Sequence, residues 1–235
     1  MAERRVFRDP AAVARAAAQT VAAAAARAIA GRGVFRIGLS GGRTPELLYR
    51  LLASPEFRDR VDWPRVHALF ADERDAPPTE PESNYWWIRK LLLERVGVPP
   101  GSVHRMKADA VDLDQAARDY EPAVSEPIDL LVLGLGEDGH TASLFPGSPA
   151  LDVEDAWVAW SPPGVLPPPV DRITLTYPVL NAARRVAFLV AGENKAAALR
   201  DVLEGHATRH IRPAAGIRPT NGTIAWFVDE GAAGR

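Results

Sequence analysis

Hydrophobic residues recur at every fourth position in the first long segment of the chain. They form one stripe of a helix, made of Val13, Ala17, Val21, Ala25 and Ile29. Asp9 followed by Pro10 is typical of a helix start, with an N-cap and then proline at the first helical position. Gly31 and Gly33 are expected to end the helix. The start of the chain therefore predicts one long helix.

Short apolar runs alternate with further helical patterns along the rest of the chain. Strands are predicted at 34–39, 65–71, 128–135, 186–191 and 223–228, each a short apolar run that ends at glycine or polar residues. Helical patterns follow the first, second and fourth of these strands; they begin near Pro45, Ser83 and Ala196. The run at 128–135 is almost continuously apolar, as in strands that are covered on both faces.

This alternation of strands and helices predicts an α/β fold. We expect a three-layer, mostly parallel, doubly wound sheet flanked by helices. The sequence shows neither an internal repeat nor a long linker, so a single domain is predicted over residues 1–235. Its weakest point is expected at 161–170, a proline-rich stretch short enough to be a surface loop.

Polar or glycine-rich segments follow four of the predicted strands. They are Ser40-Gly41-Gly42-Arg43-Thr44, Asp72-Glu73-Arg74, Asp138-Gly139-His140-Thr141 and Asn194-Lys195. Ligands of parallel sheets bind beyond the carboxyl ends of the strands. Because these four segments are expected to share that edge, the sequence predicts one site built from all of them.

The first of these segments favours an anion site. Gly41 and Gly42 allow backbone N–H groups to approach an anion closely, and the N-terminus of the following helix adds partial positive charge. Ser40, Arg43 and Thr44 would add side-chain donors. A tight turn that needs glycine only for its geometry is the alternative. Glycines placed at a helix start favour phosphate binding, although no lysine follows them as in a Walker A loop.

His140 is the candidate for proton transfer. Histidine titrates near pH ~6.5, and Asp138 would orient its ring. Of the five histidines, only His140 lies at a predicted strand end beside glycines. An isolated Asp-x-His is more often a loop histidine held by backbone, but the converging loops favour catalysis. Residues 134–139 also match GxGxxG; Glu137 and Asp138 would repel a pyrophosphate there, so no dinucleotide site is predicted.

The composition and charge of the chain exclude several classes of function. The chain has no cysteine, which excludes a disulfide framework, an iron–sulfur cluster, a thiol nucleophile and a Cys-based zinc site. Its 28 Lys+Arg against 30 Asp+Glu argue against nucleic acid as a main partner. No segment has the pattern of a signal peptide or a transmembrane helix, so we expect a cytoplasmic protein without a membrane partner. Adjacent residues such as Asp72 and Glu73 point to opposite sides of an extended segment, so no metal site is predicted.

Five segments, spread over nearly the whole chain and in a fixed order, carry a family resemblance. They are 39–45, 70–74 with Ser83-Asn84-Tyr85, 134–147, 172–176 and 192–196. The run Asp-Gly-His-Thr-Ala-Ser-Leu-Phe-Pro at 138–146 is the most specific. On these segments the chain resembles the 6-phosphogluconolactonases, in the superfamily that they share with glucosamine-6-phosphate deaminase/isomerase. The resemblance implies a Rossmann-like, deaminase-like fold.

The resemblance also implies an activity, the opening of the δ-lactone of 6-phosphogluconolactone to 6-phosphogluconate in the oxidative pentose phosphate pathway. By that similarity, His140 is the general base on water, and Asp138 and Asp72 shape the site. The groups that would hold the sugar phosphate are Ser40, Gly41, Gly42, Arg43, Thr44, Arg74, Arg172 and Lys195. No metal or organic cofactor is implied.

Two alternatives stay open. The deaminase branch resembles Asp-Gly-His-Ile-Ala-Phe-Asn-Glu-Pro at the same place; here Phe145 replaces its glutamate, which favours the lactonase. A non-catalytic sugar-phosphate sensor on the same fold would be expected to carry an added DNA-binding domain. Only one Ala-rich helix is predicted before Val34, and Asp138 and His140 are retained, which disfavours the sensor. The sequence leaves open whether Arg43 binds phosphate or faces solvent, and it does not predict the oligomeric state.

Overall fold

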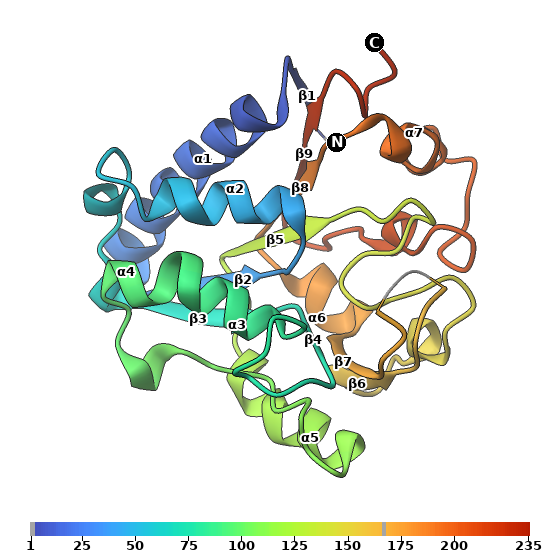
Figure 1. Ribbon diagram of the computed structural model, residues 1–235, viewed down its shortest axis with the longest axis horizontal. Helices are drawn as coiled ribbons and strands as arrows, with labels where there is room; N and C mark the ends of the chain where they lie inside the picture. Colours follow the sequence, from blue (N-terminus) through green and yellow to red (C-terminus); the bar gives the residue numbers. More distant parts are fainter. Residues whose placement is uncertain (1–2, 166–167) are drawn as a thin grey trace.

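The main sheet of the molecule has six parallel strands flanked by helices (Figure 1). A computed structural model describes residues 3–165 and 168–235. The strand order is β1 (Glu3–Phe7), β9 (Thr223–Asp229), β8 (Arg185–Val190), β5 (Leu130–Gly134), β2 (Phe35–Leu39) and β3 (Val66–Phe70). Every neighbouring pair is parallel. The predicted α/β class with a mostly parallel sheet is confirmed.

The helices are α1 (Pro10–Arg32), α2 (Arg43–Leu52), α3 (Asn84–Ile88), α4 (Glu94–Val96), α5 (Leu113–Tyr120), α6 (Tyr177–Ala182) and α7 (Ala196–Leu203). A π-helical turn at Arg89–Leu93 joins α3 to α4. Helices α1 and α2 pack against each other and against strands of the main sheet (Figure 1). None of the helices in 3–165 and 168–235 has the length and hydrophobicity needed to cross a membrane.

The ends of α1 follow the expected sequence signals. The Asp9 carboxylate accepts a hydrogen bond of 2.8 Å from the N–H of Ala12, and Pro10 occupies the first helical position. Gly33 adopts φ +81°, and its N–H donates to the carbonyl of Ile29 at 2.9 Å. Glycine tolerates this left-handed conformation and lets the chain turn directly into β2.

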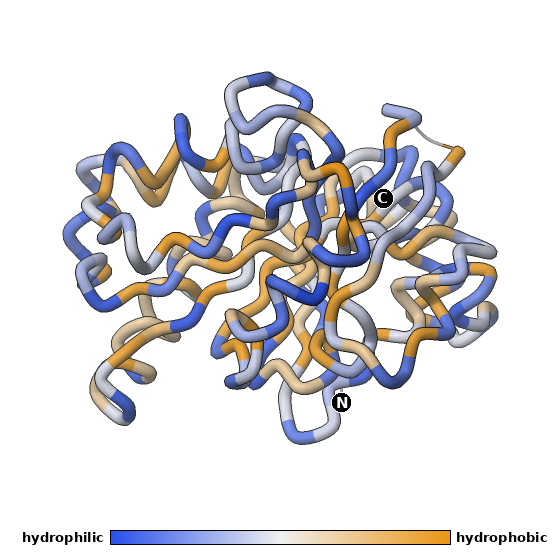
Figure 2. The backbone as a smooth tube through the Cα atoms, turned by 90° about the horizontal axis from the view of Figure 1, so that it is seen from below, coloured by the Kyte–Doolittle hydropathy of each residue, from blue (hydrophilic) through white to orange (hydrophobic). Residues whose placement is uncertain are grey.

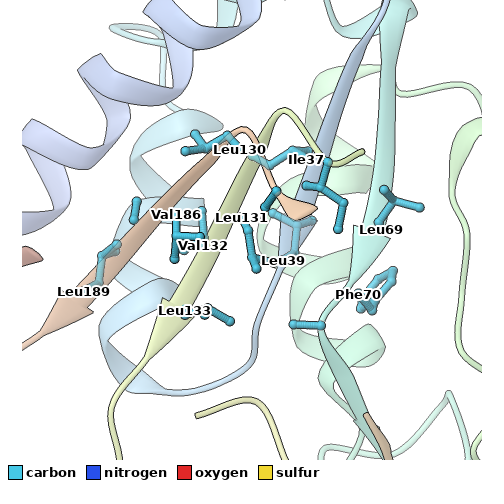
Figure 3. Packing of buried hydrophobic residues seen from close by; sticks show 14 of the residues in the cluster. Ile37, Leu39, Leu69, Phe70, Leu130, Leu131, Val132, Leu133, Val186 and Leu189 are labelled. Carbon is cyan, nitrogen blue, oxygen red and sulfur yellow. The ribbon is translucent and has the colours of Figure 1, made fainter. Parts of the chain in front are cut away.

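The core lies along β5, in the middle of the sheet between β2 and β8 (Figure 3). The side chains of Leu130, Leu131, Val132 and Leu133 are each at most 1% exposed. They are apolar in succession because helices and loops cover both faces of the strand. Figure 2 shows hydrophobic stretches of backbone running through the middle of the molecule.

A second, small sheet was not predicted. It is antiparallel, in the order β4 (Asp72–Arg74), β7 (Arg172–Leu175) and β6 (Val158–Ser161), and α5 packs on it. β4 consists of three charged residues, so it carries no hydrophobic period, and its partner β7 lies about a hundred positions along the chain. We expected Asp72-Glu73-Arg74 as the polar end of a strand; instead these residues form a strand of their own.

Two more segments differ from the prediction, and part of a third lies outside the described residues. Residues 3–7 form β1, which was not predicted because four of its five residues are Glu, Arg or Val in no regular order; it is held by parallel pairing with β9. α2 begins at Arg43, two residues before the expected Pro45. Within the predicted proline-rich loop at 161–170, residues 166 and 167 lie outside the described residues.

Candidate active site

One cavity opens at the carboxyl ends of β2, β5 and β8. The chain passes from β2 to β3 on one side and later places β5 on the other side of β2, so the winding of the sheet reverses between β2 and β5. Such a reversal leaves a crevice beyond the strand ends. The cavity there has a volume of about 490 Å³.

The cavity brings together nearly all of the residues singled out in the sequence. Those that line it are Ser40, Gly41, Gly42, Arg43, Thr44, Asp72, Arg74, His140, Arg172 and Lys195. Asp138 does not line it and lies directly behind His140. Of the charged side chains in the lining, four are cationic and two, Asp72 and Glu137, are carboxylates. The cavity therefore favours an anionic ligand.

Asp138 and His140 form a hydrogen-bonded pair. The His140 Nδ1 lies 2.6 Å from Asp138 Oδ1, and the backbone N–H of His140 donates to the same oxygen at 3.0 Å. Burial by itself raises the pKa of Asp138, but the hydrogen bonds and charge of His140 outweigh it, so the pKa lies below its ordinary value. An ionised carboxylate only accepts, so Nδ1 carries the proton and Nε2 is the ring nitrogen free to take up another.

Glycines give the Asp138–His140 loop its shape. A Cβ added at Gly136 would lie 2.0 Å from His140 Nδ1 and 2.5 Å from Asp138 Oδ1. Gly139 has φ +83°, and its N–H donates to the carbonyl of Gly136 at 3.0 Å. Two of the three glycines of the GxGxxG match, Gly136 and Gly139, therefore allow the packing of the histidine and a tight turn.

The segment before α2 forms one wall of the cavity. Gly42, with φ +108°, is the N-cap of the ten-residue helix and supplies no side-chain cap to its first N–H groups. The hydroxyl of Ser40 donates to the carbonyl of Val132 at 2.8 Å, which leaves its oxygen as an acceptor toward the cavity. The Arg43 side chain is exposed at the rim. The N–H groups at the helix start and the Arg43 guanidinium suit a phosphate, whereas the Ser40 oxygen suits a donor such as a sugar hydroxyl.

The remaining cations come from three other elements. Arg172 on β7 is only 4% exposed; its Nη2 donates to the carbonyl of Pro168 at 2.9 Å, and burial lowers its pKa while nearby Asp72 opposes the shift. Arg74 on β4 donates from Nη1 to the carbonyl of Glu82 at 2.7 Å. The Nζ of Lys195 lies 3.9 Å from a carboxylate oxygen of Glu137. Arg172 and Arg74 each keep a buried Nε that finds no partner among the described residues.

Comparison with known proteins shows the family of the chain. A sequence profile described as "Glucosamine-6-phosphate isomerases/6-phosphogluconolactonase" matches residues 8–226. The 6-phosphogluconolactonase of Rattus norvegicus is 41% identical over 239 residues, covering 97% of this chain and 91% of that protein. The chain belongs to the glucosamine-6-phosphate isomerase/6-phosphogluconolactonase family. The resemblance seen in the five motifs is thereby confirmed.

Solved structures of this family share the fold. The 6-phosphogluconolactonase from Leishmania guyanensis superposes with a TM-score of 0.89 at 26% identity, covering 99% of this chain and 98% of that one. A monomeric glucosamine-6-phosphate deaminase reaches a TM-score of 0.85 at 20% identity, with 99% of both chains covered. Since the deaminase shares the fold, the choice between the two activities within the family depends on the residues of the site.

In this family member, the charged cluster on β4 divides between two roles. Asp72 faces the cavity, and its Oδ2 accepts from the hydroxyl of Ser143 at 2.7 Å. Glu73 points the other way and is 1% exposed. Its carboxylate accepts from the N–H groups of Arg74, Asn84 and Tyr85 and from the hydroxyl of Ser83, at 2.7–3.0 Å. Burial raises the pKa of Glu73, against these hydrogen bonds.

Glu73 therefore anchors the first turn of α3 and does not face a ligand. The opposed directions of Asp72 and Glu73 agree with the alternation expected of an extended segment. Among residues 3–165 and 168–235, no three or more His, Asp or Glu side chains gather in a way that would hold a metal ion.

Several lining residues were not singled out in the sequence as site residues. Asn84 is 1% exposed; its Nδ2 donates to the backbone carbonyl of Asp72 at 3.0 Å, and its Oδ1 lies against Gly41. Ala142 adopts φ +48°, unusual for a residue other than glycine. Asn194, from a segment that the sequence did place at the site, donates from Nδ2 to Glu137. The family motif that contains Ser83 and Asn84 could have identified Asn84 as a site residue. Nothing in the sequence indicates the unusual backbone conformation of Ala142.

Proposed function

We propose that this member of the family is a lactonase, which hydrolyses 6-phospho-D-glucono-1,5-lactone to 6-phosphogluconate. The observation that carries the proposal is the Asp138–His140 pair at the wall of a cavity with an excess of cationic side chains. A lactone needs an oriented water, a proton acceptor near neutral pH and donors for the developing oxyanion. The curated relatives with 33–41% identity carry the name 6-phosphogluconolactonase.

In the proposed reaction, Nε2 of His140 accepts a proton from water while the water oxygen bonds to the lactone carbonyl carbon. The negative charge that develops on the carbonyl oxygen is stabilised by the cationic lining. When the tetrahedral intermediate collapses, the bond from carbon to ring oxygen breaks. The imidazolium then returns its proton to that oxygen, which becomes the new hydroxyl. Asp138 holds Nδ1–H and stabilises the imidazolium while it exists.

The other predicted residues bind the sugar phosphate in this proposal. The N–H groups at the start of α2, with Ser40, Gly41, Gly42, Arg43 and Thr44, and the side chains of Arg74, Arg172 and Lys195 hold the phosphate or the sugar hydroxyls. Asp72, oriented by Ser143, accepts from a hydroxyl. The phosphate is remote from the reacting carbon, so its binding energy positions the lactone. We further propose a cytoplasmic enzyme whose residues 1–235 act as one catalytic domain.

The test is lactone hydrolysis with substrate generated in situ from glucose 6-phosphate, after subtraction of spontaneous opening. The wild type should accelerate hydrolysis strongly, and folded His140→Ala should lose at least about a hundredfold in kcat. His206→Ala is the matched control, because the His206 side chain is 63% exposed and does not line the cavity.

A folded wild type that leaves the lactone untouched and releases ammonia from glucosamine 6-phosphate would overturn the proposal. The structure gives the deaminase no support at this position, because the 3% exposed ring of Phe145 lies beside His140 where that branch has a glutamate.

A further inference from the structure

Phe145 contacts two groups of the site that come from separate sheets. Its ring centroid lies 4.8 Å from that of His140, with the planes at 47°, and the Arg172 Cζ lies 4.9 Å from the Phe145 ring centroid. His140 follows β5 of the main sheet, whereas Arg172 begins β7 of the small sheet. The ring itself is 3% exposed and does not line the cavity.

Little else orients the two groups toward each other. Within 3–165 and 168–235, Arg172 makes one side-chain hydrogen bond, to the Pro168 carbonyl, and no ion pair within 4.0 Å; its Nε is buried without a partner. The ring of His140 is tied at Nδ1 to Asp138, a contact that does not reach Arg172. The face of an aromatic ring attracts a guanidinium, and a second ring packed against it limits rotation. Phe145 therefore supplies the contact that both groups share.

The ring is also held from a third side. A Cβ built on Gly164 would lie 2.4 Å from Cδ1 of Phe145 and 2.7 Å from its Cγ and Cε1, so the glycine packs directly on the ring. The Phe145 carbonyl accepts from the N–H of Ser148 at 3.0 Å, which fixes the backbone of the turn. The ring has no room to move without displacing one of its neighbours.

We infer that Phe145 is a positioning residue that sets the separation and the relative orientation of the His140 imidazole and the Arg172 guanidinium. The inference rests on the proposed lactonase function. A substrate anchored at Arg172 then presents its carbonyl carbon to a water on His140. Displacements of about 1 Å in such an arrangement can cost about a hundredfold in rate.

The first experiment is a double-mutant cycle on lactone hydrolysis with Phe145→Met, Arg172→Lys and the pair. Methionine retains most of the side-chain volume and removes the ring. We expect Phe145→Met to lower kcat/KM by about tenfold or more, mainly through kcat, with the fold retained by circular dichroism. The fold-loss in kcat/KM caused by Arg172→Lys should be at least about five times smaller in the Phe145→Met background than in the wild type.

Equal costs of Arg172→Lys in both backgrounds would overturn the inference, because a merely structural role predicts additive effects. Phe57→Met is the matched control: Phe57 is fully buried and carries the Arg60 guanidinium 4.7 Å over its ring, but it lies outside the cavity. Its effect should add to that of Arg172→Lys. Gly164→Ala, which pushes on the ring from behind, should change kcat in the same direction as Phe145→Met.

A measurement that does not require catalysis tests this inference independently of the proposed function. In NMR spectra of the imidazole, Arg172→Lys should shift the His140 ring signals in the wild-type background and shift them much less in Phe145→Met. The same shift in both backgrounds would refute the positioning role even if the lactone is not the substrate. A lactonase-inactive wild type with ring-dependent shifts would instead refute the proposed function and leave Phe145 as the link between the two groups.

Discussion

Replacing Asp138 with asparagine tests the central pair of the site with minimal change in shape. In the wild type the carboxylate accepts from His140 Nδ1 at 2.6 Å and from its backbone N–H at 3.0 Å. Asparagine removes the charge, so the imidazolium formed during turnover loses its counter-ion. An amide NH₂ turned toward Nδ1 would also favour the tautomer with the proton on Nε2, which cannot act as the base.

The size of the effect follows from the geometry. A hydrogen bond to a charged group contributes about 1.5–3 kcal/mol. Since each ~1.36 kcal/mol is tenfold in rate, Asp138→Asn should lower kcat by about 10- to 150-fold. The side chains of His140 and Asp138 are 22% and 16% exposed, so solvent screens the pair only in part and the upper half of this range is expected.

The assay is steady-state hydrolysis of the in situ lactone at neutral pH, with Asp155→Asn as the control at an exposed aspartate outside the cavity. The pKa of Asp138 lies below its ordinary 3.8, so the carboxylate stays ionised throughout the neutral range. The measured loss therefore reports the removal of the carboxylate charge and its hydrogen bond, and not a change in the protonation of Asp138. Folded Asp138→Asn with more than half of the wild-type kcat would refute the role assigned to the pair.

Two further predictions follow from the structure. In Gly136→Ala the new methyl carbon would lie 2.0 Å from His140 Nδ1, so kcat should fall at least about tenfold. Gly101→Ala meets no atom within 4 Å, lies outside the cavity and should stay near wild type; retained activity in Gly136→Ala would contradict the geometry. Burial lowers the pKa of both His67 and His104, whose Nδ1 and Nε2 lie 3.0 Å apart. As the pH falls, the two histidines therefore take up protons in the unfolded chain before they do so in the folded protein. Their contribution to the free energy of unfolding should be complete above the ordinary histidine pKa of 6.5 and should decrease as the pH falls below it toward the lowered pKa values of the folded state. Urea unfolding at about pH 7.5 and about pH 5.5 checks this, and His67→Gln should weaken the pH dependence.

The sequence by itself determined five of the six strands of the main sheet and the position of the polar segments at one edge of it. The apolar runs predicted as strands at 34–39, 65–71, 128–135, 186–191 and 223–228 correspond to β2, β3, β5, β8 and β9, because short apolar runs are stable when a sheet buries them. Parallel pairing then carries the segments that follow them to the same side. Family motifs and local rules therefore sufficed to bring His140 and the glycine-rich start of α2 into one cavity.

Only the tertiary structure decided which of the polar residues face the cavity. The pairing of β4 with β7 joins residues about a hundred positions apart. It cannot be predicted from β4 alone, because three charged residues carry no local pattern of a strand. This pairing turns Asp72 into the cavity and Glu73 toward α3. It also brings Arg172 over the ring of Phe145, beside His140. Such contacts depend on packing between distant segments, whereas the strands and turns depend on neighbouring residues, which a sequence displays directly.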